Sequence, residues 1–340
     1  MPALAVGVKS AAHVLLAAYG WAHIRYLQKP TLLILTYHRV LPTDHPERSS
    51  EQPGMVLSPE ILDQHILLLK RLQATFIHLD DWLDSPELRP EGLAVAVTFD
   101  DGWKDNFDYA YPVLRRHEVP ATIFLATAFI GTRDRFWPEQ ILERLTSGTV
   151  GQDDPLSDLL KPYVKNYPIA SRALTPQEAD EVVEKLKALP DSQIYAALSV
   201  QNGRQQESGT EARKRNILNA DELRAMGDSN LVRYGTHTRN HYRLDLLEKA
   251  GHPLSEEVVG CIQDVLNLGI PYSPIFCYPN GSQCEGAERL VRQHYAGACT
   301  TSRGWNHASS DPYSLKRINL HDGNSHSPSR FFSSIARGLL

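Results

Sequence analysis

The sequence has little cysteine, and none of it is spaced for a metal knuckle. The separations of its cysteines match neither a C-x-x-C motif nor a dense disulfide framework. Because a free cysteine behaves as a small apolar residue, we expect these side chains to be reduced and mostly buried. A reducing compartment fits this usage, so we expect a cytoplasmic protein. The cysteines are Cys261, Cys277, Cys284 and Cys299.

Concentrated positive charge is also missing. The 340 residues carry a net charge of -5, and their Lys and Arg are scattered along the chain. A nucleic-acid partner is therefore excluded, since such proteins present a basic patch. No glycine-rich phosphate loop, short repeat or low-complexity tract is present. With 42% hydrophobic residues, the chain has globular composition and length for one large domain or two ordinary ones.

The N-terminal region lacks a hydrophobic run long enough to span a bilayer. Only 15 uncharged residues separate Lys9 from Arg25, whereas a spanning helix needs about 20. Apolar residues at helical spacing, among them Leu15, Tyr19 and Tyr26, predict an amphipathic helix within residues 1–30. Three roles remain open: packing on its own domain, peripheral association with the inner membrane, or a signal peptide, which the short apolar stretch disfavours.

Short apolar runs of strand length alternate with helix-like segments in the rest of the chain. Residues 32–37 are followed by a helix that begins at Ser58, with Pro59 in its first turn. This alternation predicts a parallel sheet or barrel within a domain over residues 31–340. From about 136 to 223 the rhythm changes to charged, helix-rich sequence, which predicts a helical insertion. The other strand candidates are 94–99, 121–126, 231–234, 274–278, 296–301 and 315–320.

Two motifs carry the candidate chemistry. Asp100 and Asp101 directly follow the apolar run LAVAVTF, although adjacent carboxylates repel one another and are costly to bury unpaired. His237 and His241 follow another strand candidate and would share one face if a helix began there. Active sites of parallel α/β folds gather at the carboxyl ends of strands, where both motifs stand. One Asp and two His form a facial ligand set for a divalent cation with open positions.

The motifs resemble those of a known family. TFDDG at 98–102, HTRNH at 237–241 and YPNG at 278–281 are similar, in this order, to the motifs of the polysaccharide deacetylases, the NodB-homology carbohydrate esterases. LTYHRVLP at 35–42 is similar to the opening strand of exopolysaccharide and lipopolysaccharide members. The resemblance covers roughly residues 32–322, with the insertion outside it. It implies a distorted (β/α)7 barrel.

The resemblance also implies roles for residues at the matching positions. Asp101, His237 and His241 would bind a divalent metal, usually zinc, and Asp100 would be the general base. A base of this kind takes a proton from water while the metal polarises an amide carbonyl. In the YPNG motif, which contains Tyr278, the backbone N–H near Asn280 would stabilise the oxyanion. His321, in NLHD at 319–322, is the candidate general acid for the leaving amine.

The chain departs from the family at the YPNG motif. Cys277 and Asn280 stand where many members carry Arg and Tyr, and a thiol cannot hold a carboxylate as a guanidinium does. We hypothesise that Arg317, on the last strand candidate, or Arg303 supplies the missing guanidinium.

Three further residues are assigned to the same barrel mouth. Tyr37 and His38 end the first strand candidate, and each could contact substrate or form a structural hydrogen bond. Trp103 could stack on a sugar ring or pack against the following helix. The sequence leaves both alternatives open for each of them.

The function that these features favour is a metal-dependent hydrolase, which removes an N-acetyl group from an amino sugar of a bacterial surface glycan or its precursor. One alternative is a deacetylase or deformylase of a lipid-carrier-linked amino sugar, and another is an inactive glycan-binding barrel. An iron oxygenase fits less well, because such sites use a tight H-x-D on all-β barrels. Here Asp101 precedes His237 by 136 residues.

Overall fold

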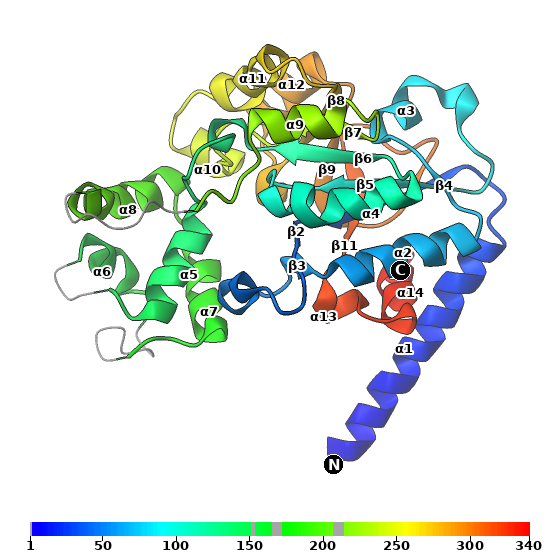
Figure 1. Ribbon diagram of the computed structural model, residues 1–340, viewed down its shortest axis with the longest axis horizontal. Coiled ribbons are helices and arrows are strands. Elements are labelled where there is room, and N and C mark those ends of the chain that lie inside the picture. Colours follow the sequence, from blue (N-terminus) through cyan, green and yellow to red (C-terminus); the bar gives the residue numbers. More distant parts are fainter. Residues whose placement is uncertain (1, 151–153, 165–171, 207–213) are drawn as a thin grey trace.

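Seven parallel strands close into a barrel in the computed structural model, which describes residues 2–150, 154–164, 172–206 and 214–340 (Figure 1). Around the barrel the order is β1-β11-β9-β8-β7-β6-β5, and β5 pairs again with β1. The strands are β1 (Thr31–Tyr37), β5 (Leu93–Phe99), β6 (Ala121–Leu125), β7 (Val232–Thr236), β8 (Tyr272–Cys277), β9 (Gly297–Arg303) and β11 (Leu315–Asn319).

Each of the predicted strands is a strand of this barrel, so the predicted (β/α)7 fold is confirmed. The reason lies in burial on both faces, which makes barrel strands read as continuous apolar runs. In β1, Leu33 and Leu35 pack in the cluster that includes Leu62 and Ile66 of the helix over residues 59–71. Leu32 and Ile34 belong to a second cluster with Ala94 and Phe124. Small side chains such as Ala94 on β5 leave room for this second cluster.

Four short strands went unrecognised in the sequence. β4 (Thr75–Phe76) pairs with β5 outside the closed ring, and β10 (Asn306–His307) pairs antiparallel with β1. β2 (Arg39–Val40) and β3 (Val56–Leu57) form a separate parallel pair. Runs of two residues are too short to show a period-2 pattern.

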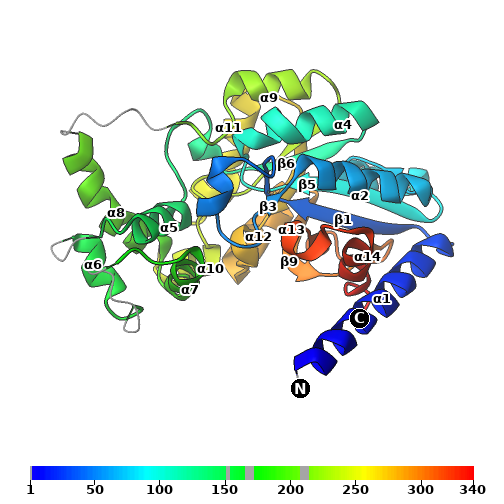
Figure 2. The same ribbon diagram turned by 60° about the horizontal axis from the view of Figure 1, so that its bottom comes forward.

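Helices cover the outside of the barrel (Figures 1 and 2). The predicted start of α2 is present, because the Ser58 side chain accepts a hydrogen bond from the Ile61 N–H and Pro59 occupies the first turn. No helix joins β9 to β11, so the ring of helices is incomplete there. The helices outside the insertion are α1 (Pro2–Arg25), α2 (Pro59–Arg71), α3 (Leu79–Asp84), α4 (Tyr111–His117), α9 (Ala220–Gly227), α10 (Leu244–Lys249), α11 (Cys261–Asn267), α12 (Glu285–His294), α13 (Asp322–Ser325) and α14 (Pro328–Ala336).

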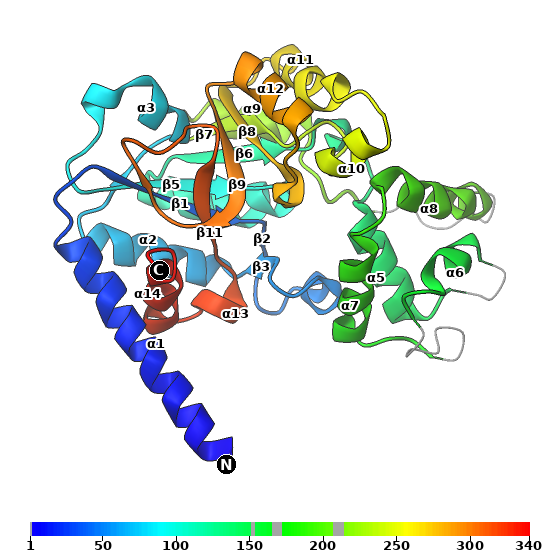
Figure 3. The ribbon, with the colours of Figure 1, turned by 180° about the vertical axis from the view of Figure 1, so that it is seen from behind.

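The insertion between β6 and β7 forms a separate helical layer beside the barrel (Figures 1 and 3). It contains α5 (Trp137–Ser147), α6 (Pro155–Leu160), α7 (Pro176–Leu186) and α8 (Asp191–Gln206), which enclose a hydrophobic cluster of their own. Helix α9 begins within the predicted range 136–223 and extends beyond it, but its Leu223 and Met226 belong to the barrel cluster. The helix that precedes β7 is therefore part of the barrel.

Helix α1 differs from the predicted amphipathic helix. Leu15, Tyr19 and Tyr26, which we assigned to its apolar stripe, face solvent. Ala17 and Ile24, on the opposite side, pack in the barrel cluster. The described part of α1 is thus apolar on both sides, which removes the polar face that defines an amphipathic helix. Within the described residues, no helix is both long and apolar enough to cross a bilayer.

Candidate active site

The two carboxylates that follow β5 point in different directions because the chain turns sharply between them. The Asp100 N–H still donates to the Tyr37 carbonyl on β1, whereas Asp101 and Gly102 have left-handed backbone conformations with φ of +74° and +80°. Asp tolerates this region better than most residues, and Gly adopts it freely. Both carboxylates are buried.

Asp101 meets the two predicted imidazoles. Its Oδ1 lies 3.5 Å from His237 Nε2 and 3.3 Å from His241 Nε2. One ligand atom from each residue lies within 4.8 Å of the others, as expected for ligands of one ion. The histidines converge without the helix that their spacing suggested. Residues 237–243 form a loop in which Thr238 and His241 have φ of +60° and +57°.

Neighbouring groups orient this cluster. The Nδ1 of His237 lies 2.7 Å from the Cys277 carbonyl oxygen, so Nδ1–H donates there and Nε2 keeps its lone pair toward Asp101. Burial lowers the pKa of His237 to about 4, and a neutral imidazole is the form that binds a metal. Trp103 donates from Nε1 to Asp101 Oδ2 over 2.9 Å and is only 1% exposed. Its indole therefore positions Asp101 and is not an open platform for a sugar.

Asp100 has a separate partner, the guanidinium of Arg317. Arg317 Nη1 donates to Oδ1 over 2.7 Å and Nη2 to Oδ2 over 2.8 Å, which is a bidentate pair. Burial alone would raise the pKa of Asp100, but the Arg317 charge outweighs it, so the pKa lies below its usual value. Cys277, at the position of the family's arginine, places its Sγ 3.8 Å from Asp100 Oδ2. Arg303 is exposed and extends from β9.

A cavity of about 470 Å³ opens over these groups. It brings together all of the predicted site residues except Tyr37, whose hydroxyl lies 3.1 Å from His65 Nδ1 in the barrel cluster. We therefore remove Tyr37 from the candidate substrate contacts. The predicted residues that line the cavity are His38, Asp100, Asp101, Trp103, His237, His241, Tyr278, Asn280, Arg317 and His321.

Two further histidines line the cavity, His38 and His321. His38 Nε2 lies 3.9 Å from Asp100 Oδ2. His321 immediately precedes α13 and lies beside Gly54, at whose position an added Cβ would come within 3.8 Å of its ring. Burial lowers the pKa of His321 below its usual value, although Asp322 opposes this. Asp322 itself accepts hydrogen bonds from Arg48 and the Ser58 N–H.

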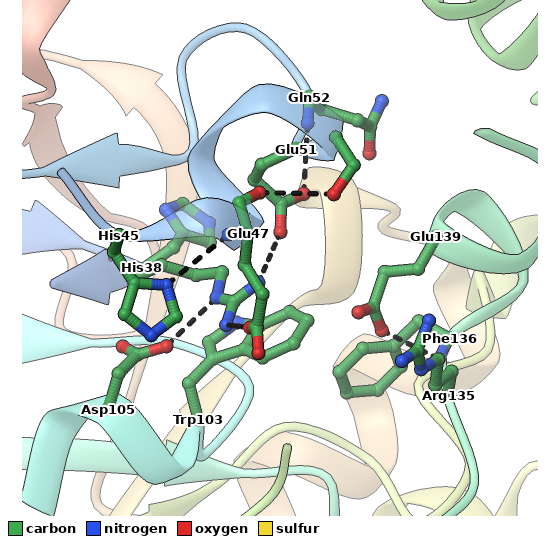
Figure 4. Close-up of polar contacts among 12 residues, drawn as sticks. His38, His45, Glu47, Glu51, Gln52, Trp103, Asp105, Arg135, Phe136 and Glu139 are labelled. Carbon is green, nitrogen blue, oxygen red and sulfur yellow. Dashed lines mark hydrogen bonds and ion pairs between the residues drawn. The ribbon is translucent and has the colours of Figure 1, made fainter. Parts of the chain in front are cut away.

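The insertion contributes a wall of the cavity that the sequence did not reveal. The Phe136 ring packs at a tilt beside that of His241, with ring centroids 4.9 Å apart, and Glu139 follows on α5. Glu51 approaches from the segment before β3, and Figure 4 shows its carboxyl group and that of Glu139 directed toward the same space. Burial and the Glu51 charge raise the pKa of Glu139 to about 8.

Arg39 holds the Glu51 segment in place. Its guanidinium donates to Asp105, Glu51 and Glu47 at 2.8, 2.6 and 2.6 Å, and its Cζ lies 4.5 Å from the centre of the Trp103 ring (Figure 4). Arg39 occurs in the LTYHRVLP stretch, so its position was visible in the sequence. Its three partners were not, because they stand at separate places along the chain.

The fold and the site together define a parallel barrel with a carboxylate and two imidazoles at the carboxyl ends of its strands. The model of the polysaccharide deacetylase family matches residues 88–152, which include Asp100 and Asp101. The resemblance to this family that the motifs indicated is thereby confirmed, and the relatives below agree with it.

Two curated relatives match about a third of the chain. YxkH of Bacillus subtilis, which has a provisional polysaccharide deacetylase name, is 29% identical over 112 residues, 33% of this chain and 37% of its own length. The poly-β-1,6-N-acetyl-D-glucosamine N-deacetylase of Staphylococcus epidermidis is 30% identical over 113 residues, 31% of this chain and 39% of its own length. The matched segments thus span less than half of each relative.

The fold is similar to that of a solved structure. The crystal structure of a polysaccharide deacetylase from Bacillus cereus matches 90% of this chain and 69% of its own, with a TM-score of 0.56 and 16% identity. At this identity the match shows a shared fold. The reaction of this protein must therefore be inferred from the residues that line its own cavity.

Proposed function

We propose that this protein is a metal-dependent hydrolase that removes the N-acetyl group from an amino sugar of a bacterial surface glycan or its precursor. The observation that carries the proposal is that two adjacent carboxylates have different partners. Asp101 converges with His237 and His241, while Asp100 is held apart by Arg317. Metal-dependent hydrolysis of an amide requires a set of metal ligands and a separate carboxylate that acts as the base.

The donor set fits a divalent ion. Its atoms are one carboxylate oxygen and two imidazole nitrogens, the imidazole of His237 is fixed by the Cys277 carbonyl, and all three side chains lie at the cavity. This combination of ligands suits zinc. When bound, such an ion would polarise the amide carbonyl and acidify water.

The residues of the chain would carry the proton transfers. Asp100, kept ionised by Arg317, accepts a proton from the attacking water, and the backbone N–H near Asn280 stabilises the oxyanion. His321 donates a proton to the amine as the C–N bond breaks, which yields acetate and the free amino sugar. Since a guanidinium does hold Asp100, the departure at Cys277 gives little support to an inactive, glycan-binding barrel.

A test that needs no substrate is the metal content of the purified protein. We expect wild type and Asp100→Asn to hold near-stoichiometric zinc or another divalent ion, and His237→Ala to lose it. A wild type that stays metal-free after zinc is supplied would refute the proposed chemistry.

Acetate release then tests the reaction itself. The polymer named for the Staphylococcus epidermidis relative, poly-β-1,6-N-acetyl-D-glucosamine, is the first substrate to try, followed by lipid-carrier-linked N-acetylated and N-formylated amino sugars. Asp100→Asn should reduce turnover about 10²–10⁴-fold while it keeps its metal. Full activity of that variant would contradict the role of Asp100.

A further inference from the structure

Helix α1 packs against the rest of the protein through one side only. Most of its contacts are with α14, and the His23 ring also lies 5.3 Å from that of Trp305, while Ala17 and Ile24 are buried in the barrel cluster. His13 Nδ1 lies 3.1 Å from Ser333 Oγ, which fixes the pairing of the two helices. Figures 1 and 3 show α1 running from the barrel past its edge, with no other element over its outer side.

The outer side of α1 is a continuous apolar surface. Val14, Leu15, Tyr19, Trp21 and Tyr26 are all exposed, Leu15 by 71% and Tyr26 by 73%. At 100° per residue the four positions within α1 fall on one half of the helix, and Tyr26 directly follows its last residue. Of the seven large hydrophobic side chains exposed in the described chain, five belong to this surface. A cluster of exposed hydrophobic side chains marks an interaction site, because on most protein surfaces such side chains are exposed singly and far apart.

The charge around this surface is opposite to that of the whole chain. The net charge is -5, yet residues 1–43 contain no Asp or Glu, and neither do residues 323–340. Arg25 is exposed among the apolar side chains, and Lys29 follows. Arg337, at the end of α14, is exposed and lies 3.2 Å from His13 through its Nη2. The helix pair therefore presents cations beside apolar groups, without acidic neighbours in sequence.

We propose that the outer side of α1 lies in the interface of a membrane with anionic headgroups. Val14 and Leu15 would enter the acyl boundary, Trp21 and the tyrosines would occupy the headgroup level, and Arg25 and Lys29 would contact lipid phosphates. The helix would lie along the surface, since no helix of the described residues is both long and apolar enough to cross a bilayer. A second copy of the chain is a poorer occupant, because it would place Arg25 and Arg337 beside like charges.

This inference goes beyond the proposed reaction and does not depend on it. It would keep the protein at a membrane, where lipid-carrier-linked sugars are found.

Cosedimentation with vesicles tests the inference. We expect the full chain to bind vesicles of phosphatidylcholine mixed with phosphatidylglycerol, and to bind pure phosphatidylcholine more weakly. The double variant Leu15→Glu/Trp21→Glu should weaken binding to the mixed vesicles by about tenfold or more. Leu266→Glu is the matched control, because Leu266 is an apolar residue 51% exposed on α11, away from α1. It should bind as wild type does.

The variants should keep the thermal unfolding midpoint of wild type, since the substituted side chains are exposed. Equal vesicle binding by wild type and the double variant would overturn the proposal. So would a dimer of the wild type, seen by analytical ultracentrifugation, that the double variant abolishes, because a second copy would then occupy the surface.

Discussion

Asp100 and Asp101 are neighbours in the chain but have different surroundings. Asp101 faces two imidazoles and an indole N–H, and Asp100 faces a guanidinium. The Asp101–Gly102 backbone, with both φ values positive, separates the two carboxylates. At the scale of single residues, we therefore expect Trp103, beside Asp101, to affect metal affinity and Arg317, beside Asp100, to affect stability.

Trp103 should affect metal affinity through its hydrogen bond to Asp101. Trp103→Phe keeps an aromatic ring in a site that is 1% exposed but removes the Nε1–H donor. Removal of such a supporting bond typically weakens metal binding about 10–100-fold. Competition with a chromophoric chelator measures this affinity. Trp82→Phe, a buried tryptophan of α3 outside the cavity, is the control, and equal affinities of the two variants would contradict the prediction.

Arg317 should matter to stability because Asp100 is buried with it. Arg317→Ala leaves an unpaired buried carboxylate, which we expect to lower the free energy of unfolding by about 3–5 kcal/mol. Urea denaturation measures this loss. Arg303→Ala, at the exposed alternative position, should cost little. If the unpaired charge of Asp100 causes this loss, the double variant Asp100→Asn/Arg317→Ala should recover much of the free energy of unfolding. A double variant as unstable as Arg317→Ala would show that the unpaired charge is not the cause.

Glu139 should give stability a pH dependence. Its pKa is about 8 in the folded protein and 4.5 as a free carboxyl. Between these values the folded state holds a proton that the unfolded state releases, so this group's contribution to stability falls as pH rises from about 4.5 to 8. Glu139→Gln should therefore match wild type near pH 5 and melt at a higher temperature near pH 8.5.

Calorimetry without added metal measures these midpoints. Glu143→Gln, on the exposed side of the same helix, is the matched variant and should follow wild type at both pH values. Parallel curves for wild type and Glu139→Gln would show that Glu139 is not protonated at neutral pH.

At the scale of elements, the insertion and the barrel have separate hydrophobic cores. Leu145 on α5 is fully buried in the insertion, and Leu35 on β1 in the barrel. Yet Phe136, which directly precedes α5, and Glu139 on α5 line the cavity. The proposed metal ligands follow strands β5 and β7 of the barrel, and the insertion contacts their loop through Phe136 beside His241 and Asp191, which accepts from the Arg243 N–H. We expect the insertion mainly to shape the cavity.

Leu145→Ala should destabilise the insertion by about 2–5 kcal/mol, as expected for a buried leucine. Hydrogen exchange should show faster exchange in α5 and α7, with β5 and β7 unchanged and metal content retained. Leu35→Ala should show faster exchange in β5 and β7, with α5 and α7 unchanged. Loss of the metal in Leu145→Ala would mean that the insertion supports the ligands directly.

The sequence predicted elements far better than their contacts. The barrel strands were recognisable because burial on both faces leaves continuous apolar runs. The loop that brings His237 and His241 together was not, because positive φ at Thr238 and His241 has no pattern in non-glycine residues.

Side-chain partners were harder to predict than backbone elements. The sequence left Arg317 and Arg303 as candidates for the guanidinium that pairs with Asp100. The choice depends on closure of the barrel, which places β11 beside β1. Glu139 reads in the sequence as an ordinary capping residue of α5, and its raised pKa depends on Glu51, which lies in another segment. For Tyr37 the structure shows the structural hydrogen bond, one of the two alternatives left open, because a one-residue step decides which face a strand residue occupies.

At the scale of the whole molecule, the barrel closes between its first and last strands. β1 pairs with β5 on one side and with β11 on the other. Asp100 and Asp101 come from the first third of the chain, His237 and His241 from its last third, and Arg317 and His321 from the final 24 residues of the sequence. The site is thus assembled from long-range contacts, which are the slow ones to form.

This closure has a consequence for protein synthesis. A ribosome releases the chain from the N-terminus onward, so Asp100 emerges more than two hundred residues before Arg317. Until β11 arrives, the carboxylate that would act as the base has no guanidinium beside it, and the cavity has an open side where His321 will stand. A nascent chain of this protein can therefore carry no complete site until β11 and His321 have left the ribosome.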